Sequence, residues 1–134
     1  MGIALRPPTA GVDRFVAAPP EAVWRILVDV DQWPLWGPSV RRAALDEGGT
    51  LLGPGATGTV WTAVGVALPF AVTGFDPGRR WDWTVAGVRA TGHQVTAAPG
   101  GCVVRFETPW WAVGYLPVCA AALARIARLA DQPQ

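Results

Sequence analysis

Residues 16–40 read VAAPPEAVWRILVDVDQWPLWGPSV and carry the strongest structural signals in the chain. Pro20 suits the first position of a helix, and Glu21 places a negative charge where the helix dipole favours one. The apolar residues that follow recur at helical spacing. Proline does not continue a helix, so we expect this helix to end near Asp29 and a second short helical turn to form around Pro34.

Residues on both sides of this stretch show β patterns. A strand is predicted at 12–17, and six more follow the helices at 40–45, 58–64, 68–75, 80–85, 89–97 and 102–108. Short connections such as Asp76-Pro77-Gly78 predict an antiparallel meander. Residues 116–130 return to helical spacing and predict a long C-terminal helix. A sheet with so little helix must bury its concave face against that helix, in a single domain over 1–134 with a loose segment at 1–10.

Composition excludes several classes of protein. The chain has 134 residues, of which 51% are hydrophobic and 16% charged, which rules out a disordered tail or a charged coiled coil. The uncharged stretch 48–75 contains seven glycines and two prolines, so we interpret it as a buried β-hairpin rather than an integral membrane span. The net charge is +1 with no basic cluster, which argues against nucleic acid as a partner.

The inventory of cysteine and histidine predicts neither a metal site nor a cofactor. Cys102 and Cys119 lack zinc-ligand spacing, and His93 is the only histidine. The N-terminus has no apolar core of a signal peptide, so we expect a cytoplasmic protein with two reduced thiols. Cys119 lies on the inward face of the C-terminal helix, and we interpret it as a core thiol.

Several motifs resemble the START-like, or SRPBCC, superfamily, which includes polyketide cyclase/dehydrase-like proteins. The matching residues are Ala18-Pro19-Pro20, Val23-Trp24, Asp29, Trp33-Pro34, Trp36, Pro38, Phe75-Asp76-Pro77 and Gly100-Gly101. The resemblance covers nearly the whole chain. It implies an α+β helix-grip fold: a seven-stranded curved antiparallel sheet wrapped around a long C-terminal helix, with two short helices after the first strand. The superfamily fold leaves an apolar cavity between sheet and helix.

The eight tryptophans fall into groups with different expected roles. Trp24, Trp33 and Trp36 are interpreted as fold residues that close the junction of helices and sheet. Trp81 and Trp83 share one face of their strand with Val85, and that face should look into the cavity. There they either fill the space or stack on a planar ligand. Trp61 could face either way, and Trp110-Trp111 could cover the entrance or contact a partner protein.

Polar residues on two strands supply the remaining candidates. His93 shares its strand face with Thr91 and Val95, so it is either a hydrogen-bonded core residue or a polar anchor or general acid/base in the cavity. Arg89, at the strand end, either holds an anionic head group or lies solvated at the rim. Arg105 and Glu107 are expected outside, as an exposed pair of little energetic value.

The function we favour from the sequence is binding of a small hydrophobic or aromatic molecule in the cavity. The expected ligand-binding residues are Trp61, Trp81, Trp83, Arg89, Thr91, His93, Val95, Phe106, Cys119 and Leu123. An alternative is an enzyme of the polyketide cyclase/aromatase kind, with His93 as the single catalytic candidate. A third is a partner-binding module without a small ligand. The sequence leaves open whether there is catalysis and whether the protein is a monomer or a homodimer.

Overall fold

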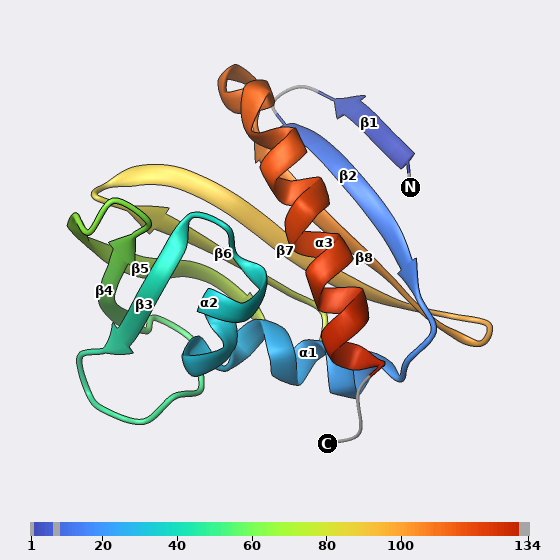
Figure 1. Cartoon of the computed structure of the whole chain (residues 1–134), viewed down its shortest axis with the longest axis horizontal. Coiled ribbons are helices and arrows are strands. Elements are labelled where there is room, and N and C mark those ends of the chain that lie inside the picture. The colour runs from blue at the N-terminus through green and yellow to red at the C-terminus, as the bar shows by residue number, and fades with distance from the viewer. Residues whose placement is uncertain (1, 7–8, 132–134) are drawn as a thin grey trace.

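An antiparallel sheet forms most of the protein in the computed structural model, which describes residues 2–6 and 9–131 (Figure 1). The strands are β1 (Gly2–Arg6), β2 (Thr9–Val16), β3 (Val40–Leu45), β4 (Thr57–Thr62), β5 (Ala67–Asp76), β6 (Arg80–Val85), β7 (Val88–Ala98) and β8 (Gly101–Pro109). They pair in the order β1-β2-β8-β7-β6-β5-β4-β3. The sheet is strongly curved, so its concave face can enclose a core.

Two groups of helices lie on the concave side. After β2 come α1 (Pro20–Val28), the 3-10 turn η1 (Val30–Gln32) and α2 (Trp33–Trp36), and after β8 come η2 (Trp110–Tyr115) and α3 (Leu116–Ala130). Pro20 stands in the first turn of α1, and the Asp29 side chain accepts a hydrogen bond from the backbone of Asp31, which starts η1. The long helix α3 crosses the sheet and packs mainly on β2 and β8 (Figure 1). The half of the sheet that contains β3 to β6 is therefore left for other side chains to cover.

The structure confirms the predicted helix-grip fold. All seven predicted strands, both short helices and the C-terminal helix are present in the predicted order. The stretch 48–75 forms β4, β5 and their connections, as expected for a hairpin. By length and composition the segment Trp111–Ala130 could cross a membrane. In this fold it is η2 followed by α3, and α3 buries one face in the core, with Leu123 and Ile126 fully inaccessible.

The N-terminus differs from the prediction. Residues 2–6, expected to belong to a loose segment, form β1, which pairs antiparallel with β2 from Gly2 opposite Asp13 to Arg6 opposite Thr9. This eighth strand is held by backbone pairing along the free edge of β2, a non-local interaction that local sequence pattern does not reveal. Met1, Pro7 and Pro8 lie outside the described residues.

A cluster of aromatic rings fixes the short helices to the sheet. The indole N–H of Trp33 donates to the carbonyl of Leu27 at 2.9 Å, and that of Trp36 donates to the carbonyl of Ile26 at 3.2 Å. These bonds satisfy two buried polar groups and set the direction of both rings. Trp33 then stacks on Trp81 with ring centres 5.5 Å apart and planes within 5°. The interpretation of Trp33 and Trp36 as junction residues is thus confirmed.

The outer face of the sheet carries a charged network that the sequence analysis underestimated. Glu107 is only 9% exposed and accepts hydrogen bonds from Arg80 and Thr9. Arg105 lies 3.7 Å from Glu107 and donates to Asp13 at 2.9 Å. The expectation of an exposed Arg105–Glu107 pair is therefore wrong, although both side chains do lie on the outer face.

Glycines explain how these long side chains become buried against a sheet. A β-carbon on Gly11 would collide with the guanidinium of Arg105, and one on Gly92 would collide with Arg80 and Asp82. Because these positions lack side chains, the two arginines lie flat on the backbone, where Arg105 reaches Asp13 on the adjacent strand β2 and Arg80 reaches across β7 to Glu107 on β8. Arg80 donates to Asp82 at 2.7 Å from its terminal nitrogen.

Replacing Glu107 with Gln should lower the free energy of unfolding by about 1–3 kcal/mol, because Arg80 loses one of its two charged acceptors. Burial alone would raise the pKa of Glu107, but hydrogen bonds from Arg80 and Thr9 and the nearby positive charges hold it below its ordinary value. The carboxylate therefore stabilises the fold above its unfolded pKa, and this contribution is lost as acid protonates it. Urea unfolding at several pH values measures both effects, and the exposed Glu47→Gln is the matched control. Equal stability of the two variants would contradict this role.

Candidate functional site

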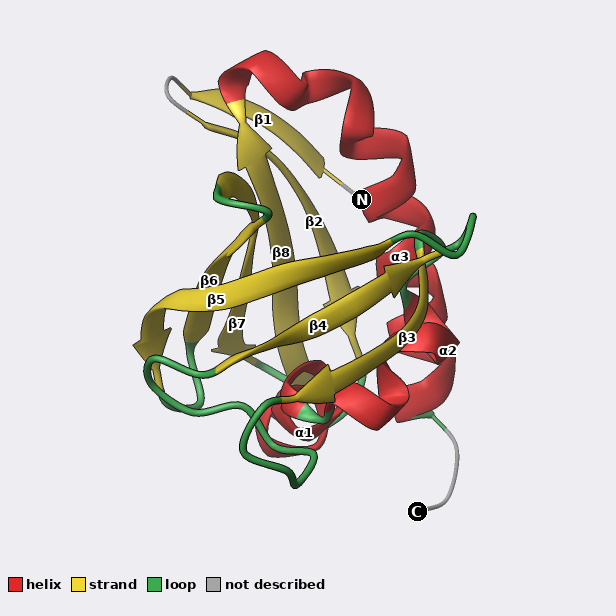
Figure 2. Cartoon of the chain, turned by 90° about the vertical axis from the view of Figure 1, so that its left-hand side faces the viewer, coloured by secondary structure: helices red, strands yellow, loops and turns green. Residues whose placement is uncertain are grey.

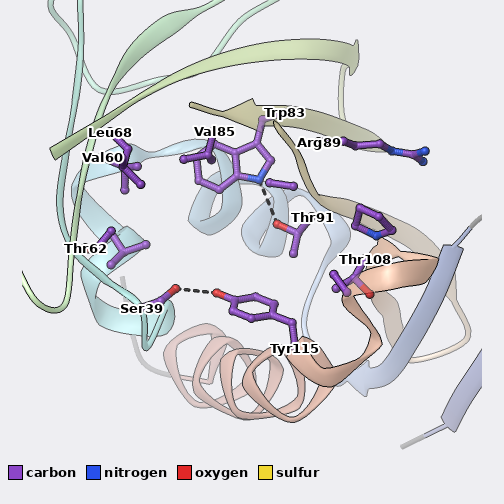
Figure 3. Close-up of a pocket in the computed structure, with 14 residues that line it drawn as sticks. Ser39, Val60, Thr62, Leu68, Trp83, Val85, Arg89, Thr91, Thr108 and Tyr115 are labelled. Carbon is purple, nitrogen blue, oxygen red and sulfur yellow. Dashed lines mark hydrogen bonds between the residues drawn. The ribbon is translucent and has the colours of Figure 1, made fainter. Parts of the chain in front are cut away.

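A cavity of about 330 Å³ lies between the concave face of the sheet and η2 (Figure 3). The strands β4 to β8 supply most of its wall, and the segment before β3 and η2 close the remaining side. The lining residues are Ser39, Val40, Val60, Thr62, Leu68, Trp83, Val85, Arg89, Ala90, Thr91, Thr108, Pro109, Ala112 and Tyr115. The cavity thus occupies the part of the concave face that α3 leaves uncovered.

Trp83 forms one wall of the cavity and is held in place on two sides. Its ring packs edge-on against Trp33 and Phe70, with centres 5.2 Å and 5.5 Å apart. Its indole N–H donates to the hydroxyl oxygen of Thr91 at 3.0 Å. The anchored indole presents a flat apolar surface. Because its position is already fixed, ligand binding does not lose the conformational entropy of this side chain. Figure 3 shows Val60 and Leu68 farther along the sheet wall from Trp83, with Tyr115 across the space from the indole.

Thr91 connects Trp83 to His93 through a hydrogen-bond chain of defined direction. His93 Nδ1 lies 3.2 Å from the carbonyl oxygen of Trp81, and His93 Nε2 lies 2.9 Å from the Thr91 hydroxyl. A carbonyl can only accept, so Nδ1 carries the proton and Nε2 accepts from Thr91. Thr91 therefore donates to His93, accepts from Trp83 and keeps one lone pair for a further donor.

His93 is a buried neutral residue in this arrangement. It is 2% exposed and stacks on Trp81 at a ring distance of 3.8 Å. Burial, with a smaller contribution from the charge of Arg80, lowers the pKa of His93 to about 3. Both ring nitrogens are already bonded to protein groups. The geometry thus matches the hydrogen-bonded core histidine considered from the sequence, and gives no free nitrogen for acid/base chemistry in the cavity.

A hydrogen bond between Ser39 and Tyr115 closes one side of the cavity. The two hydroxyl oxygens are 2.6 Å apart and join the segment before β3 to η2 (Figure 3). Burial raises the pKa of Tyr115, so its hydroxyl stays protonated at neutral pH. These two residues border both the main cavity and a smaller pocket behind it.

Thr108 contributes a hydroxyl that has no hydrogen-bond partner in the part of the chain that the structure describes. The residue is 2% exposed and its oxygen is fully inaccessible, yet it borders the cavity. A buried unpaired hydroxyl costs about 1–3 kcal/mol. Because that oxygen is inaccessible, the hydroxyl destabilises the fold and is not a contact for a molecule in the cavity.

The deeper half of the interior is filled. Aromatic rings of Trp33, Trp36, Trp81 and Phe106 leave a pocket of only about 50 Å³ between them and α3. Cys119 borders this pocket, and burial raises the pKa of its thiol to about 12, so it is a neutral apolar group. The tryptophans thus fill the inner half of the interior and leave the outer half open.

The structure does not bring all the expected ligand residues to one space. Trp83 and Thr91 border both the main cavity and the small inner pocket, Arg89 borders the main cavity, and Trp81, His93, Phe106 and Cys119 border the inner pocket. Val95 and Leu123 are buried core residues and border neither space.

Trp61 lies on the other side of the sheet from the cavity. Its neighbours Val60 and Thr62 line the cavity, so Trp61 faces outward, and the guanidinium of Arg42 sits 4.5 Å from its ring centre. The position of Trp61 therefore does not support the prediction that it contacts a ligand in the cavity.

Most residues of the cavity wall were not predicted from the sequence. Val60, Thr62, Leu68, Ser39 and Tyr115 were not singled out. Their positions depend on the outward direction of Trp61 and on how η2 folds back, neither of which the pattern determined. Thr108 could have been found, because it shares its strand face with Phe106. Arg89 is exposed and points away from the cavity centre at its rim (Figure 3).

No group of three histidine, cysteine or carboxylate side chains converges as a metal site would require within residues 2–6 and 9–131. Cys102 and Cys119 are free and buried on different elements. The Trp110 side chain is outside the described part, whereas Trp111 is 69% exposed beside the entrance.

Comparison with protein families gives one match that covers nearly the entire chain. The model of the family described as polyketide cyclase / dehydrase and lipid transport matches residues 9–129. The chain belongs to this family. The match includes every element that builds the cavity, from β2 to α3. Among curated proteins no match was found.

Solved structures of three bacterial proteins share the fold of this chain. MLL2253 from Mesorhizobium loti superposes with a TM-score of 0.75 at 18% identity, over 94% of this chain and 98% of that one. NE0264 from Nitrosomonas europaea gives 0.71 at 15% identity, over 93% and 96%. CV1439 from Chromobacterium violaceum gives 0.64 at 21% identity, over 96% and 100%. At these identities the likeness concerns the fold alone.

NMR of the single histidine tests the assigned tautomer without ambiguity. The ring of His93 should keep its proton on Nδ1 and show no titration from about pH 8 to about pH 5, because it protonates only near pH 3. The unfolded chain takes up this proton near pH 6.5, so acid below that value favours unfolding. A titration midpoint near 6.5 in the folded protein would contradict the assignment.

Thr108→Val should raise the free energy of unfolding by about 1 kcal/mol, since it removes an unpaired buried hydroxyl while keeping the shape. Thr91→Val is the matched control and should lower stability by about 1–3 kcal/mol, because it leaves Trp83 and His93 without a partner. Thermal or urea unfolding of both variants measures the difference. Destabilisation of the Thr108 variant would show that this hydroxyl is satisfied in the folded protein.

Proposed function

We propose that the protein binds a small, uncharged hydrophobic or aromatic molecule in the cavity beside Trp83. The observation that carries the proposal is a cavity of about 330 Å³ with an almost entirely apolar wall and an anchored indole. This volume lies at the lower end of the usual range for small-molecule sites. The family is described as polyketide cyclase / dehydrase and lipid transport. Polyketides and lipids are largely apolar molecules, which supports a hydrophobic ligand here.

The charges around the cavity favour a neutral ligand. Arg89 is the single charged residue among those that border it, and its side chain extends away from the centre (Figure 3). Burying an unpaired charge is costly, so a carboxylate or phosphate inside would find no partner. Thr91 can accept one more hydrogen bond, because its proton is donated to His93 and one lone pair is free. A ligand with one hydroxyl or amine on an apolar ring system would donate to Thr91 and match the apolar walls.

The expected affinity is modest. Burial of roughly 200–300 Å² of apolar ligand surface contributes on the order of 5–8 kcal/mol before the cost of association is subtracted. Dissociation constants in the micromolar range or weaker follow from this. The rigid position of Trp83 limits the ordering cost that a mobile side chain would add.

Fluorescence titration with N-phenyl-1-naphthylamine, an uncharged apolar probe, tests the proposal. The probe should bind the wild type in a saturable way, and Trp83→Ala should weaken binding at least tenfold through the loss of one wall. Val60→Phe, which projects a larger ring into the cavity, should have a similar effect. Trp61→Ala removes a tryptophan from the outer face and serves as the matched control with unchanged binding.

Circular dichroism and thermal unfolding establish that each variant is folded before the comparison is made. Val60→Phe is the decisive variant, since it adds apolar bulk into open space rather than removing a packed ring. Equal probe affinity of the wild type, Trp83→Ala and Val60→Phe would contradict the proposal. A loss of affinity caused by Trp61→Ala alone would place the site on the outer face instead.

A further inference from the structure

Exposed apolar side chains are concentrated at the entrance of the cavity. Among the described residues, nine large hydrophobic side chains are exposed. Six of them come from three short segments: Val64, Val66, Val88, Trp111, Val113 and Tyr115. Val64 is 84% exposed and Trp111 is 69% exposed, which are the two highest values. So much exposed apolar surface is unfavourable in a chain of this size unless another molecule covers it when the protein functions.

Each of the three segments is joined directly to the cavity wall. The turn between β4 and β5 lies between the lining residues Thr62 and Leu68, and the turn between β6 and β7 lies between Val85 and Arg89. The third segment, η2, itself provides Ala112 and Tyr115. Figure 2 shows both turns and the start of the C-terminal helical segment arranged around one side of the molecule. We call this ring of segments the mouth surface.

Charge is distributed unevenly between the two ends of the sheet. Arg89 belongs to the mouth surface, and the side chain of Arg41 lies against the turn between β4 and β5, close to Gly65. No carboxylate occurs in residues 62–68, 85–90 or 108–115. At the opposite ends of these strands, Asp46 and Glu47 follow β3, and Asp76 is the last residue of β5. The mouth surface therefore combines apolar tips with positive charge alone.

We propose that the mouth surface docks onto an anionic lipid bilayer. Valine and tryptophan on separate loops can enter the interfacial region without a complementary shape, and tryptophan is favoured at that depth. Arginines beside them can reach lipid phosphates. Binding of this kind gains both from buried apolar area and from attraction to anionic lipid. A protein partner would need a continuous groove or a matching acidic face, and the three separate convex turns provide no groove.

The inference goes beyond the proposed function and does not require a loaded cavity. Docking of the mouth surface would orient the cavity, with its entrance facing the hydrocarbon core of the bilayer. An apolar molecule could then pass between bilayer and cavity without crossing bulk water. Docking is measured with vesicles and no probe, whereas cavity binding is measured with a probe and no vesicles, so failure of either leaves the other testable.

Co-sedimentation with vesicles tests the docking. Wild-type protein should bind vesicles of phosphatidylcholine mixed with phosphatidylglycerol at least tenfold more tightly than vesicles of phosphatidylcholine alone, and added salt should weaken binding. Val64→Asp and Trp111→Glu should each weaken it at least tenfold. Leu51→Asp changes another exposed apolar residue, away from the mouth surface, and is the control. Arg41→Glu should weaken binding, with the exposed Arg79→Glu as its control.

Three results would overturn the inference. One is an absence of binding to the anionic vesicles, and another is equal loss with Leu51→Asp and Val64→Asp. The third is a concentration-dependent dimer, detected by sedimentation without lipid and abolished by Trp111→Glu, because the mouth surface would then cover a second copy of the chain. Val64→Asp should retain affinity for N-phenyl-1-naphthylamine, since Val64 does not line the cavity.

Discussion

The stack of Trp33, Trp81 and His93 is the interaction on which the rest of the interior depends. Trp33 comes from α2, and the other two rings come from β6 and β7, so the stack joins the short helices to the centre of the sheet. It fills the space that the C-terminal helix does not reach. Because the stack ends at Trp83, the interior beyond that ring stays open, and the cavity begins there.

The polar groups follow the same division between a filled half and an open half. In the filled half, burial keeps His93 and Cys119 neutral and every ring nitrogen of the histidine is occupied. In the open half, Thr91 keeps an unused lone pair. Charges are confined to the outer face and the rim. The protein thereby offers an apolar ligand a few neutral polar contacts and no ionic one.

The sequence predicted the fold well because its signals are local. Prolines and helical spacing in residues 16–40, and alternation in the strands, indicated every strand and α-helix except β1, whose formation depends on pairing with β2. Strand alternation also predicted that Trp83 and Thr91 face inward. It could not predict how far Trp33 reaches across the sheet, which decides where the cavity lies. Nor could it predict the burial of Glu107, which depends on glycines of adjacent strands.

The open space of the interior lies beside Trp83 and not within the aromatic stack. A crystal structure of the complex with N-phenyl-1-naphthylamine would show which of the two places holds the ligand. We expect the probe between Trp83 and Val60, with its amine donating to the Thr91 hydroxyl and the stacked rings unmoved. Density for the probe between Trp81 and Cys119, or on the outer face near Trp61, would contradict this expectation.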